Sequence, residues 1–276
     1  NGFLPIKIKK NNNLTLPCNH KLTSGSAQVK SAILLSSLGA AGKTTILEKV
    51  GSRDHTEIML KYLGAKISKK GEKISLESPN FLKSRDIYIP GDFSSAAFLI
   101  VAGLIIPRSK ITLKDVGLNY YRIGLIDVLK KMNARINIKN KRKLNDEEIG
   151  DLEVLSSNLK GVSFTGKISP RMIDEYPIVF IAASFASGTS VFKGLGELKV
   201  KESNRLKVMY ESLKSLGVKL EMGDSYMKIE GGKNYTCNAK IKTFDDHRIA
   251  MSSLVFGMAS NGSVEIDDMS MINTSF

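Results

Sequence analysis

The sequence contains no tryptophan, and its 276 residues include only two cysteines and three histidines. Cys18 and Cys237 lie far apart, and no Cys-x-x-Cys pair is present, which argues against a disulfide framework and a structural zinc site. No run of 18 apolar residues occurs and no signal peptide is recognisable, so we expect no membrane span. These absences predict a cytoplasmic protein without a bound metal.

Acidic residues are also scarce, with 27 against 41 basic ones, and the formal net charge is +14. The lysines that dominate the basic set are spread along the chain, and aromatic residues make up only 7%. A nucleic-acid interface is typically a clustered basic stripe, so this pattern does not favour one. We expect a lysine-rich surface with a site for small anionic substrates.

Two sequence elements alternate along the chain. The first is an apolar helix followed by a β-branched strand, and it begins at Ser26, Ser94, Asp174 and Asp246. The second is an amphipathic helix with a polar start, followed by a strand, at residues 52–70, 119–138 and 201–222. This alternation predicts an α/β fold of repeated β-α-β-α-β-β units, with the apolar helices buried.

Capping and turn residues predict where these helices begin and end. We expect N-cap or first-turn residues at Ser24, Ser52, Ser94, Asp174 and Asp246. We expect helix stops at Gly39, Gly64, Gly103 and Gly217. A charged, loop-like segment at 78–86 precedes a Pro-Gly turn, which predicts a domain boundary close to residue 87.

Cations stand at several predicted helix starts, where the helix dipole disfavours them. Arg53, Lys201 and Arg248 occupy such positions, and Arg205 lies one turn after Lys201. A cation beside the free N–H groups of a helix start is well suited to bind an oxyanion. A local ion pair, such as Arg53 with Glu57, is the alternative at any single position.

Six stretches resemble the signature sequences of the 5-enolpyruvylshikimate-3-phosphate synthase family, in the order in which that family carries them. They are residues 26–35, 52–60, 91–100, 173–190, 198–206 and 245–251. The wording "SAQVKSA" and "RDHTE" is similar to the bacterial branch. The chain opens on a strand-like stretch without Met, and the resemblance covers about the last two-thirds of a full enzyme, so we expect a fragment.

The resemblance implies a two-domain enolpyruvyl transferase fold, an inside-out α/β barrel with three units in each domain. Residues 1–87 would form part of the second domain, and residues 88–276 most of the other, with units starting near 88, 166 and 238. The implied reaction transfers the enolpyruvyl group of phosphoenolpyruvate to shikimate 3-phosphate and releases phosphate, without metal or organic cofactor. The complete enzyme would be a monomer, and this fragment alone would be inactive.

The matched stretches also imply roles for individual residues. Asp174, Glu202 and Lys201 would be catalytic. Shikimate 3-phosphate would contact Ser26, Ala27, Gln28, Arg53, Asp174 and Lys201, and phosphoenolpyruvate would contact Gln28, Arg205 and Arg248. Some members carry a lysine where this chain has Thr274, so a substrate contact at that position is not carried over.

Two other functions stay open. A UDP-N-acetylglucosamine enolpyruvyl transferase shares the fold and the reaction type, although its loop cysteine and nucleotide-sugar signatures are not found in this chain. A non-catalytic basic module that binds RNA would also fit the composition.

Overall fold

The computed structural model describes residues 6–7, 15–23, 25–78, 81–232, 234–273 and 275–276. Ser24, Thr274 and most of the strand-like start lie outside these residues. The chain divides into two compact units, which we call unit 1 (Asn1–Asp86) and unit 2 (Ile87–Phe276). Their assignment to the two domains of a complete enzyme stays a prediction.

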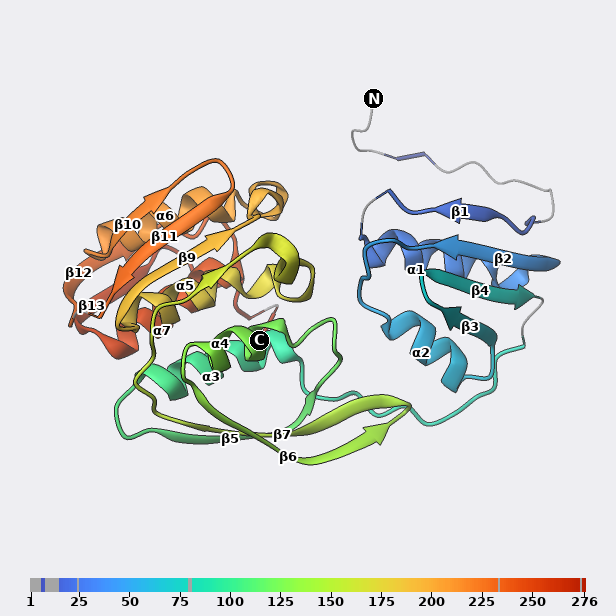
Figure 1. Cartoon of the computed structure of the whole chain (residues 1–276), viewed down its shortest axis with the longest axis horizontal. Coiled ribbons are helices and arrows are strands. Elements are labelled where there is room, and N and C mark those ends of the chain that lie inside the picture. Colours follow the sequence, from blue (N-terminus) through green and yellow to red (C-terminus); the bar gives the residue numbers. More distant parts are fainter. Residues whose placement is uncertain (1–5, 8–14, 24, 79–80, 233, 274) are drawn as a thin grey trace. The chain divides into compact units, whose positions relative to one another are not determined.

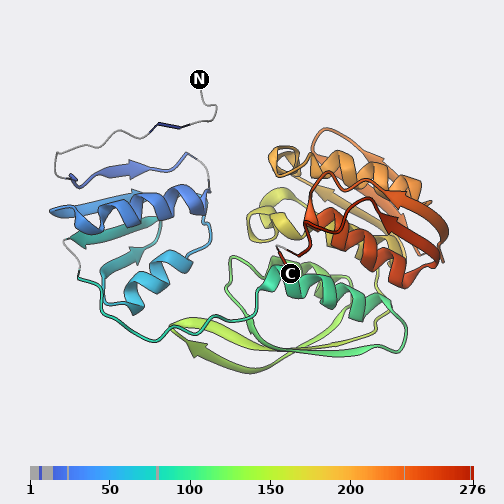
Figure 2. The same ribbon diagram turned by 180° about the vertical axis from the view of Figure 1, so that it is seen from behind.

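Unit 1 is a four-stranded sheet with two helices on one face (Figures 1 and 2). Its elements are β1 (Asn19–Lys21), α1 (Ala27–Ser36), a 3-10 turn (Ser37–Gly39), β2 (Gly42–Leu47), α2 (His55–Tyr62), β3 (Lys66–Lys70) and β4 (Lys73–Ser78). The strand order is β1-β2-β4-β3, with β1 parallel to β2 and the other pairs antiparallel. The helices bury a small apolar core against the sheet, including Leu34, Leu60 and Ile74.

The helix ends in unit 1 follow the sequence in part. Ser26 caps α1, and its Oγ accepts a hydrogen bond from the Val29 N–H at 3.3 Å. Gly64 follows α2 with φ of +93°, as a stop requires. The prediction that Ser52 starts α2 is wrong, because Asp54 takes the N-cap position and the Ser52 hydroxyl binds Glu48 instead, at 2.5 Å.

Unit 2 contains three sheets. Its first half comprises α3 (Phe93–Ile105), β5 (Lys110–Gly117), α4 (Gly124–Lys131), β6 (Arg135–Leu144), β7 (Glu147–Leu155) and β8 (Ser163–Phe164). The 3-10 turns at Gly166–Arg171 and Ile173–Glu175 lead into α5 (Tyr176–Phe185), β9 (Gly188–Lys193), a 3-10 turn (Gly196–Val200) and α6 (Arg205–Ser215). The last elements are β10 (Lys219–Met222), β11 (Tyr226–Gly231), β12 (Thr236–Ile241), α7 (His247–Ala259) and β13 (Asn261–Ile266).

The predicted β-α-β-α-β-β repeat is confirmed. In unit 1, a parallel pair joined through the first helix is followed by an antiparallel pair, in the order β1-β2-β4-β3. Unit 2 repeats this arrangement in the order β8-β9-β11-β10 and, with a parallel bridge from Gly91 to Val116 in place of the first strand, in β5-β7-β6. The parallel pair β12-β13 begins the same pattern again.

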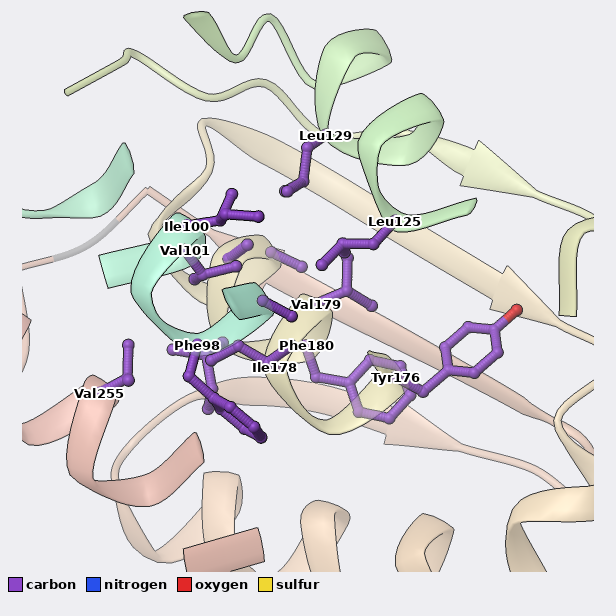
Figure 3. Packing of buried hydrophobic residues seen from close by; sticks show 14 of the residues in the cluster. Phe98, Ile100, Val101, Leu125, Leu129, Tyr176, Ile178, Val179, Phe180 and Val255 are labelled. Atoms are coloured by element: carbon purple, nitrogen blue, oxygen red, sulfur yellow. The ribbon is translucent and has the colours of Figure 1, made fainter. Parts of the chain in front are cut away.

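The three apolar helices of unit 2 pack against one another in its centre. Each also contacts a different sheet: α3 lies on β5 and β7, α5 on β11, and α7 on β13. Figure 3 shows Val101 of α3, Val179 of α5 and Val255 of α7 among the side chains of this core. Because these helices touch protein on almost every side, they are apolar around most of their circumference.

The caps of the central helices are polar residues close to their predicted positions. Asp92 caps α3 and Ser94 lies in its first turn, whereas Asp246 caps α7 itself. The prediction that Gly103 stops a helix is wrong, because α3 continues to Ile105. A Cβ at position 103 would lie 3.0 Å from Ile111 Cδ1, so this glycine allows α3 to approach its sheet closely.

Two groups of aromatic side chains strengthen the core of unit 2. Tyr176, Phe180 and Phe192 form one group, with ring centroids 5.6–6.2 Å apart. Phe185, Tyr235 and Phe256 form the other, with centroids 5.1–5.3 Å apart. Burial raises the pKa of Tyr235 to about 12.

Within the described part of the chain, no helix is long and apolar enough to cross a membrane.

Candidate active site

Arg205, the first residue of α6, is fully buried and bound to three carboxylates. Its Nε donates to Asp246 Oδ2 at 2.8 Å, its Nη1 to Asp174 Oδ1 at 3.2 Å and its Nη2 to Glu202 Oε2 at 2.5 Å. Burial alone would lower the pKa of Arg205, but the hydrogen bond and charge of Asp246 outweigh it. The guanidinium is therefore a fixed positive centre held by acids from three different segments.

Asp174 lies among three arginines. Besides Arg205, its Oδ2 faces Arg122 Nη1 at 3.7 Å and Arg248 Nη2 at 3.8 Å. Arg248 Nη1 also donates to the Asp174 backbone carbonyl at 3.3 Å. Burial favours the neutral acid, but Arg248, Arg205, Lys201 and Arg122 together lower the pKa of Asp174. This carboxylate is thus ionised at neutral pH, in a partly enclosed position.

Asp246 ties the starts of α6 and α7 together. Its Oδ1 accepts from the Arg248 N–H at 3.0 Å, while its Oδ2 accepts from Arg205 and, at 2.9 Å, from the Ser203 hydroxyl. This places Arg248, in the first turn of α7, beside the carboxylate of Asp174. Arg248 Nε is buried and finds no hydrogen-bond partner among the described residues, so this guanidinium can still serve an acceptor.

Lys201 and Glu202 complete this group. Lys201 Nζ pairs with Glu197 Oε1 at 2.6 Å, and its charge helps to lower the pKa of Asp174 without direct contact. The Glu202 side chain is 56% exposed although it binds Arg205. The structure therefore brings together Asp174, Lys201, Glu202, Arg205 and Arg248. Arg205 and Arg248 both lie beside the Asp174 carboxylate.

The remaining predicted site residues lie at two helix starts of unit 1. Ser26 caps α1, Ala27 begins it, and Gln28 is exposed in its first turn. Arg53 directly precedes Asp54, the N-cap of α2. Within the described ranges, no hydrogen bond or ion pair engages the Arg53 guanidinium, because Glu57 pairs with Lys30 instead.

The chemistry available to these groups is that of anion binding and proton transfer. Helix starts with adjacent cations bind phosphate or carboxylate groups, and a carboxylate among arginines can accept and hold a proton during a reaction. In the part of the chain that the structure describes, no three His, Cys, Asp or Glu side chains gather to hold a metal ion.

Residues 1–276 match the protein family described as EPSP synthase (3-phosphoshikimate 1-carboxyvinyltransferase). The chain belongs to the EPSP synthase family. A 3-phosphoshikimate 1-carboxyvinyltransferase of Zymomonas mobilis is 47% identical over 270 residues, which are 95% of this chain and 60% of that protein. The Bacillus pumilus protein of the same name is 43% identical over 91% of this chain and 59% of its own length.

A solved EPSP synthase from Acinetobacter baumannii superposes with a TM-score of 0.90 at 37% identity, over 96% of this chain and 61% of that one. The chain thus spans about three-fifths of the length of the curated relatives it matches. The fold predicted from the sequence is confirmed, because the structure superposes on that of a solved EPSP synthase. The roles of individual residues stay predictions.

One part of this candidate site was missed in the sequence. Arg122 Nη2 donates to Ser94 Oγ at 2.5 Å, and Ser94 Oγ donates to Glu175 Oε1, also at 2.5 Å. Glu175 is buried, which raises its pKa. The signal was in the repeat, since Arg122 directly precedes the N-cap of α4 as Arg53 precedes that of α2.

Proposed function

We propose that the full-length protein containing this chain transfers the enolpyruvyl group of phosphoenolpyruvate to the 5-hydroxyl of shikimate 3-phosphate and releases phosphate. The observation that carries this proposal is the position of Asp174, a carboxylate held between Arg122, Arg205 and Arg248. Such a site offers one proton acceptor within a cationic surrounding that suits two polyanionic substrates.

In the proposed reaction, Asp174 takes the proton of the 5-hydroxyl while that oxygen bonds to C2 of phosphoenolpyruvate. Glu202, which is half exposed, delivers a proton to the methylene carbon C3. Phosphate then leaves C2 while Glu202 takes a proton back from C3, which restores the double bond, and the proton held by Asp174 passes to the leaving phosphate. Two carboxylates in different surroundings are suited to these opposite proton transfers.

Arg205 and Arg248 would hold the carboxylate and phosphate of phosphoenolpyruvate, and Gln28 would also contact this substrate. The Nε, Nη1 and Nη2 atoms of Arg205 each already donate to a carboxylate. An incoming anion would therefore compete with Asp174 and Glu202 for this guanidinium. Binding of this substrate would thereby release the two acids for proton transfer. Arg248 needs no such exchange at Nε, which is unsatisfied among the described residues.

Ser26, Ala27, Gln28, Arg53, Asp174 and Lys201 would contact shikimate 3-phosphate. Backbone N–H groups at a helix start and an arginine are suitable ligands for its phosphate. We further propose that the complete protein is a cytoplasmic monomer that needs no cofactor and binds no nucleic acid.

The test is a phosphate-release assay on the purified full-length protein. Phosphate should appear with shikimate 3-phosphate and phosphoenolpyruvate together, and with neither alone. Release from UDP-N-acetylglucosamine and phosphoenolpyruvate instead would assign the sister activity. Salt-dependent RNA binding without affinity for shikimate 3-phosphate would identify a binding module.

A further inference from the structure

Lys30 of α1 is fully buried, and it binds three other residues of unit 1. Its Nζ lies 2.8 Å from Glu57 Oε1 and 3.0 Å from Glu48 Oε1, and it donates to the Ser52 carbonyl at 3.3 Å. A lysine is rarely buried completely, because its charge must be compensated by partners. Here those partners come from the segment after β2 and from the first turn of α2.

The segment that carries Arg53 is attached to Lys30 through Ser52. Besides the carbonyl that accepts from Lys30, the Ser52 N–H donates to Glu48 Oε1 at 3.1 Å and the Ser52 hydroxyl to the same oxygen at 2.5 Å. Ser52 is thus fixed at its backbone N–H, its carbonyl and its side chain. Since Arg53 is the next residue, the backbone position from which its side chain extends is fixed together with Ser52.

The same lysine also orients the start of α1 against the start of α2. Figures 1 and 2 show the two helices side by side on one face of the sheet, beginning at the same end of it. Lys30 lies two residues after Gln28, and its partner Glu57 lies in the first turn of α2. A hydroxyl pair, Ser31 with Thr56 at 2.6 Å, joins the helices a second time.

The charges around Lys30 fit a site that must accept an anion nearby. Burial raises the pKa of Glu57 despite its bond to Lys30, which favours the neutral acid. Burial acts in the same direction on Glu48, but Ser52 and Lys30 outweigh it and lower its pKa. Lys69 adds a cation 3.5 Å from Glu48 Oε2. Because Glu57 favours the neutral form and two lysines lie beside Glu48, the cluster adds no uncompensated negative charge behind the helix starts.

We propose that Lys30 is a positioning residue, which sets the start of α1 and the side chain of Arg53 in the mutual geometry needed to hold one phosphate monoester. This inference rests on the proposed function, which assigns shikimate 3-phosphate to Ser26, Gln28 and Arg53. Lys30 itself is too deeply buried to touch the substrate. Its contribution is preorganisation, since groups held in place before binding lose less freedom when the ligand arrives.

The experiment replaces the ion pair in the full-length protein by apolar residues of similar volume, Lys30→Met together with Glu57→Leu. Such replacements often preserve stability, and the remaining acid, Glu48, keeps Lys69 and both hydrogen bonds from Ser52. The dissociation constant for shikimate 3-phosphate, measured by titration calorimetry, should rise at least about tenfold, a change of roughly 1.4 kcal/mol. The KM for phosphoenolpyruvate should rise by a smaller factor, since Arg205 and Arg248 of unit 2 are untouched and only Gln28 is shared by the two substrates.

A matched control is Ile74→Ala, which weakens the core of unit 1 without touching the helix starts. If general loss of stability caused the effect, this variant would also lose affinity for shikimate 3-phosphate, and the positioning role would be refuted. Ser52→Ala keeps the buried charges and serves if the double variant does not fold. It removes one bond to Glu48, and the dissociation constant should rise about threefold.

The outcomes separate the two proposals. Tight binding by the unsubstituted protein with unchanged affinity in the double variant, or in Ser52→Ala if only that variant folds, overturns the role of Lys30. Absence of binding by the unsubstituted protein overturns the proposed function itself. A selective loss of affinity for shikimate 3-phosphate, with the control unaffected, supports the positioning role.

Discussion

Units 1 and 2 both bury a cation against carboxylates near helix starts, yet the pKa of Glu57 in unit 1 and the pKa of Asp174 in unit 2 shift in opposite directions. In unit 1, the buried cation Lys30 faces Glu48 and Glu57, and the pKa of Glu57 is raised. In unit 2, several cations surround Asp174, and its pKa is lowered. Burial favours the neutral acid in both places. The number of cations for each carboxylate therefore decides which of these acids keeps its charge.

The two units also differ in how they are held together. The apolar core of unit 1 comprises seven buried residues among the described positions, whereas that of unit 2 extends over three central helices and their sheets. A small core contributes less apolar burial to stability. Polar links such as the Lys30 cluster consequently bear more on the geometry of unit 1 than similar links do in unit 2.

The largest effect is expected from Asp174→Asn in the full-length protein, because the ionised carboxylate in unit 2 is the proposed base. Asparagine keeps the size of the side chain but cannot take the proton. We expect kcat to fall by about two to four orders of magnitude, with binding of shikimate 3-phosphate largely kept. The measurement is phosphate release, with substrate binding followed by calorimetry.

A matched control is Asp127→Asn in the same unit, since Asp127 is a half-exposed partner of Arg171 outside the site. It should keep near-normal turnover. If Asp174→Asn does so as well, Asp174 only helps to begin the helix that follows, and unit 2 has no special carboxylate.

A smaller effect is expected from Arg248→Ala. Loss of its charged hydrogen bonds should weaken binding of phosphoenolpyruvate by about 1.5–3 kcal/mol and that of shikimate 3-phosphate by less. Arg248 is also the foremost of the charges that lower the pKa of Asp174, so the acidic limb of the kcat–pH profile should move to higher pH. Arg135→Ala, at an exposed arginine of the same unit, is the control. Equal weakening of both substrates would contradict the assignment.

The smallest effect, and the one that tests unit 1, is expected from Glu57→Gln. The pKa of Glu57 is raised in the fold, so its contribution to stability is present below the unfolded pKa and lost as pH rises through the folded pKa. Glutamine does not titrate, so the variant should gain stability relative to the unsubstituted protein between pH 5 and 8. Urea unfolding of the full-length protein measures this difference, which should stay within about 1.5 kcal/mol, the size of one net hydrogen bond.

Glu77→Gln, at an exposed carboxylate on the surface of the same unit, is the control. A Glu57→Gln variant that instead loses stability as pH rises would mean that Glu57 is charged in the fold. The contrast between the two units would then disappear.

The repeat was predictable because each helix carries its own periodicity, its cap and a nearby glycine, all of which are local. Gly103 misled because a glycine that allows two elements to approach looks, in sequence, like one that ends a helix. Ser52 misled because its hydroxyl donates to Glu48, four residues earlier in the chain, and does not cap α2.

The candidate site shows the same limit. The cations at the helix starts were visible because they oppose the helix dipole, and the family resemblance indicated which of them matter. The three bonds of Arg205 to acids were not visible, since Asp174 and Asp246 lie 31 and 41 residues away from it in sequence. The burial of Lys30 was not predicted either, because a lysine in a helix is usually exposed.

The aromatic residues packed in unit 2 give the molecule a built-in optical label. Because tryptophan is absent, near-ultraviolet signals come from tyrosine and phenylalanine, and of the eight tyrosines only Tyr62 belongs to unit 1. Circular dichroism in this range therefore reports on the packing around Tyr176 and Tyr235. As long as this core stays folded, Tyr235 ionises only near pH 12, because burial raises its pKa to about 12. A single tryptophan introduced into unit 1 would be spectrally distinct, so the melting of each unit could be followed separately in one sample.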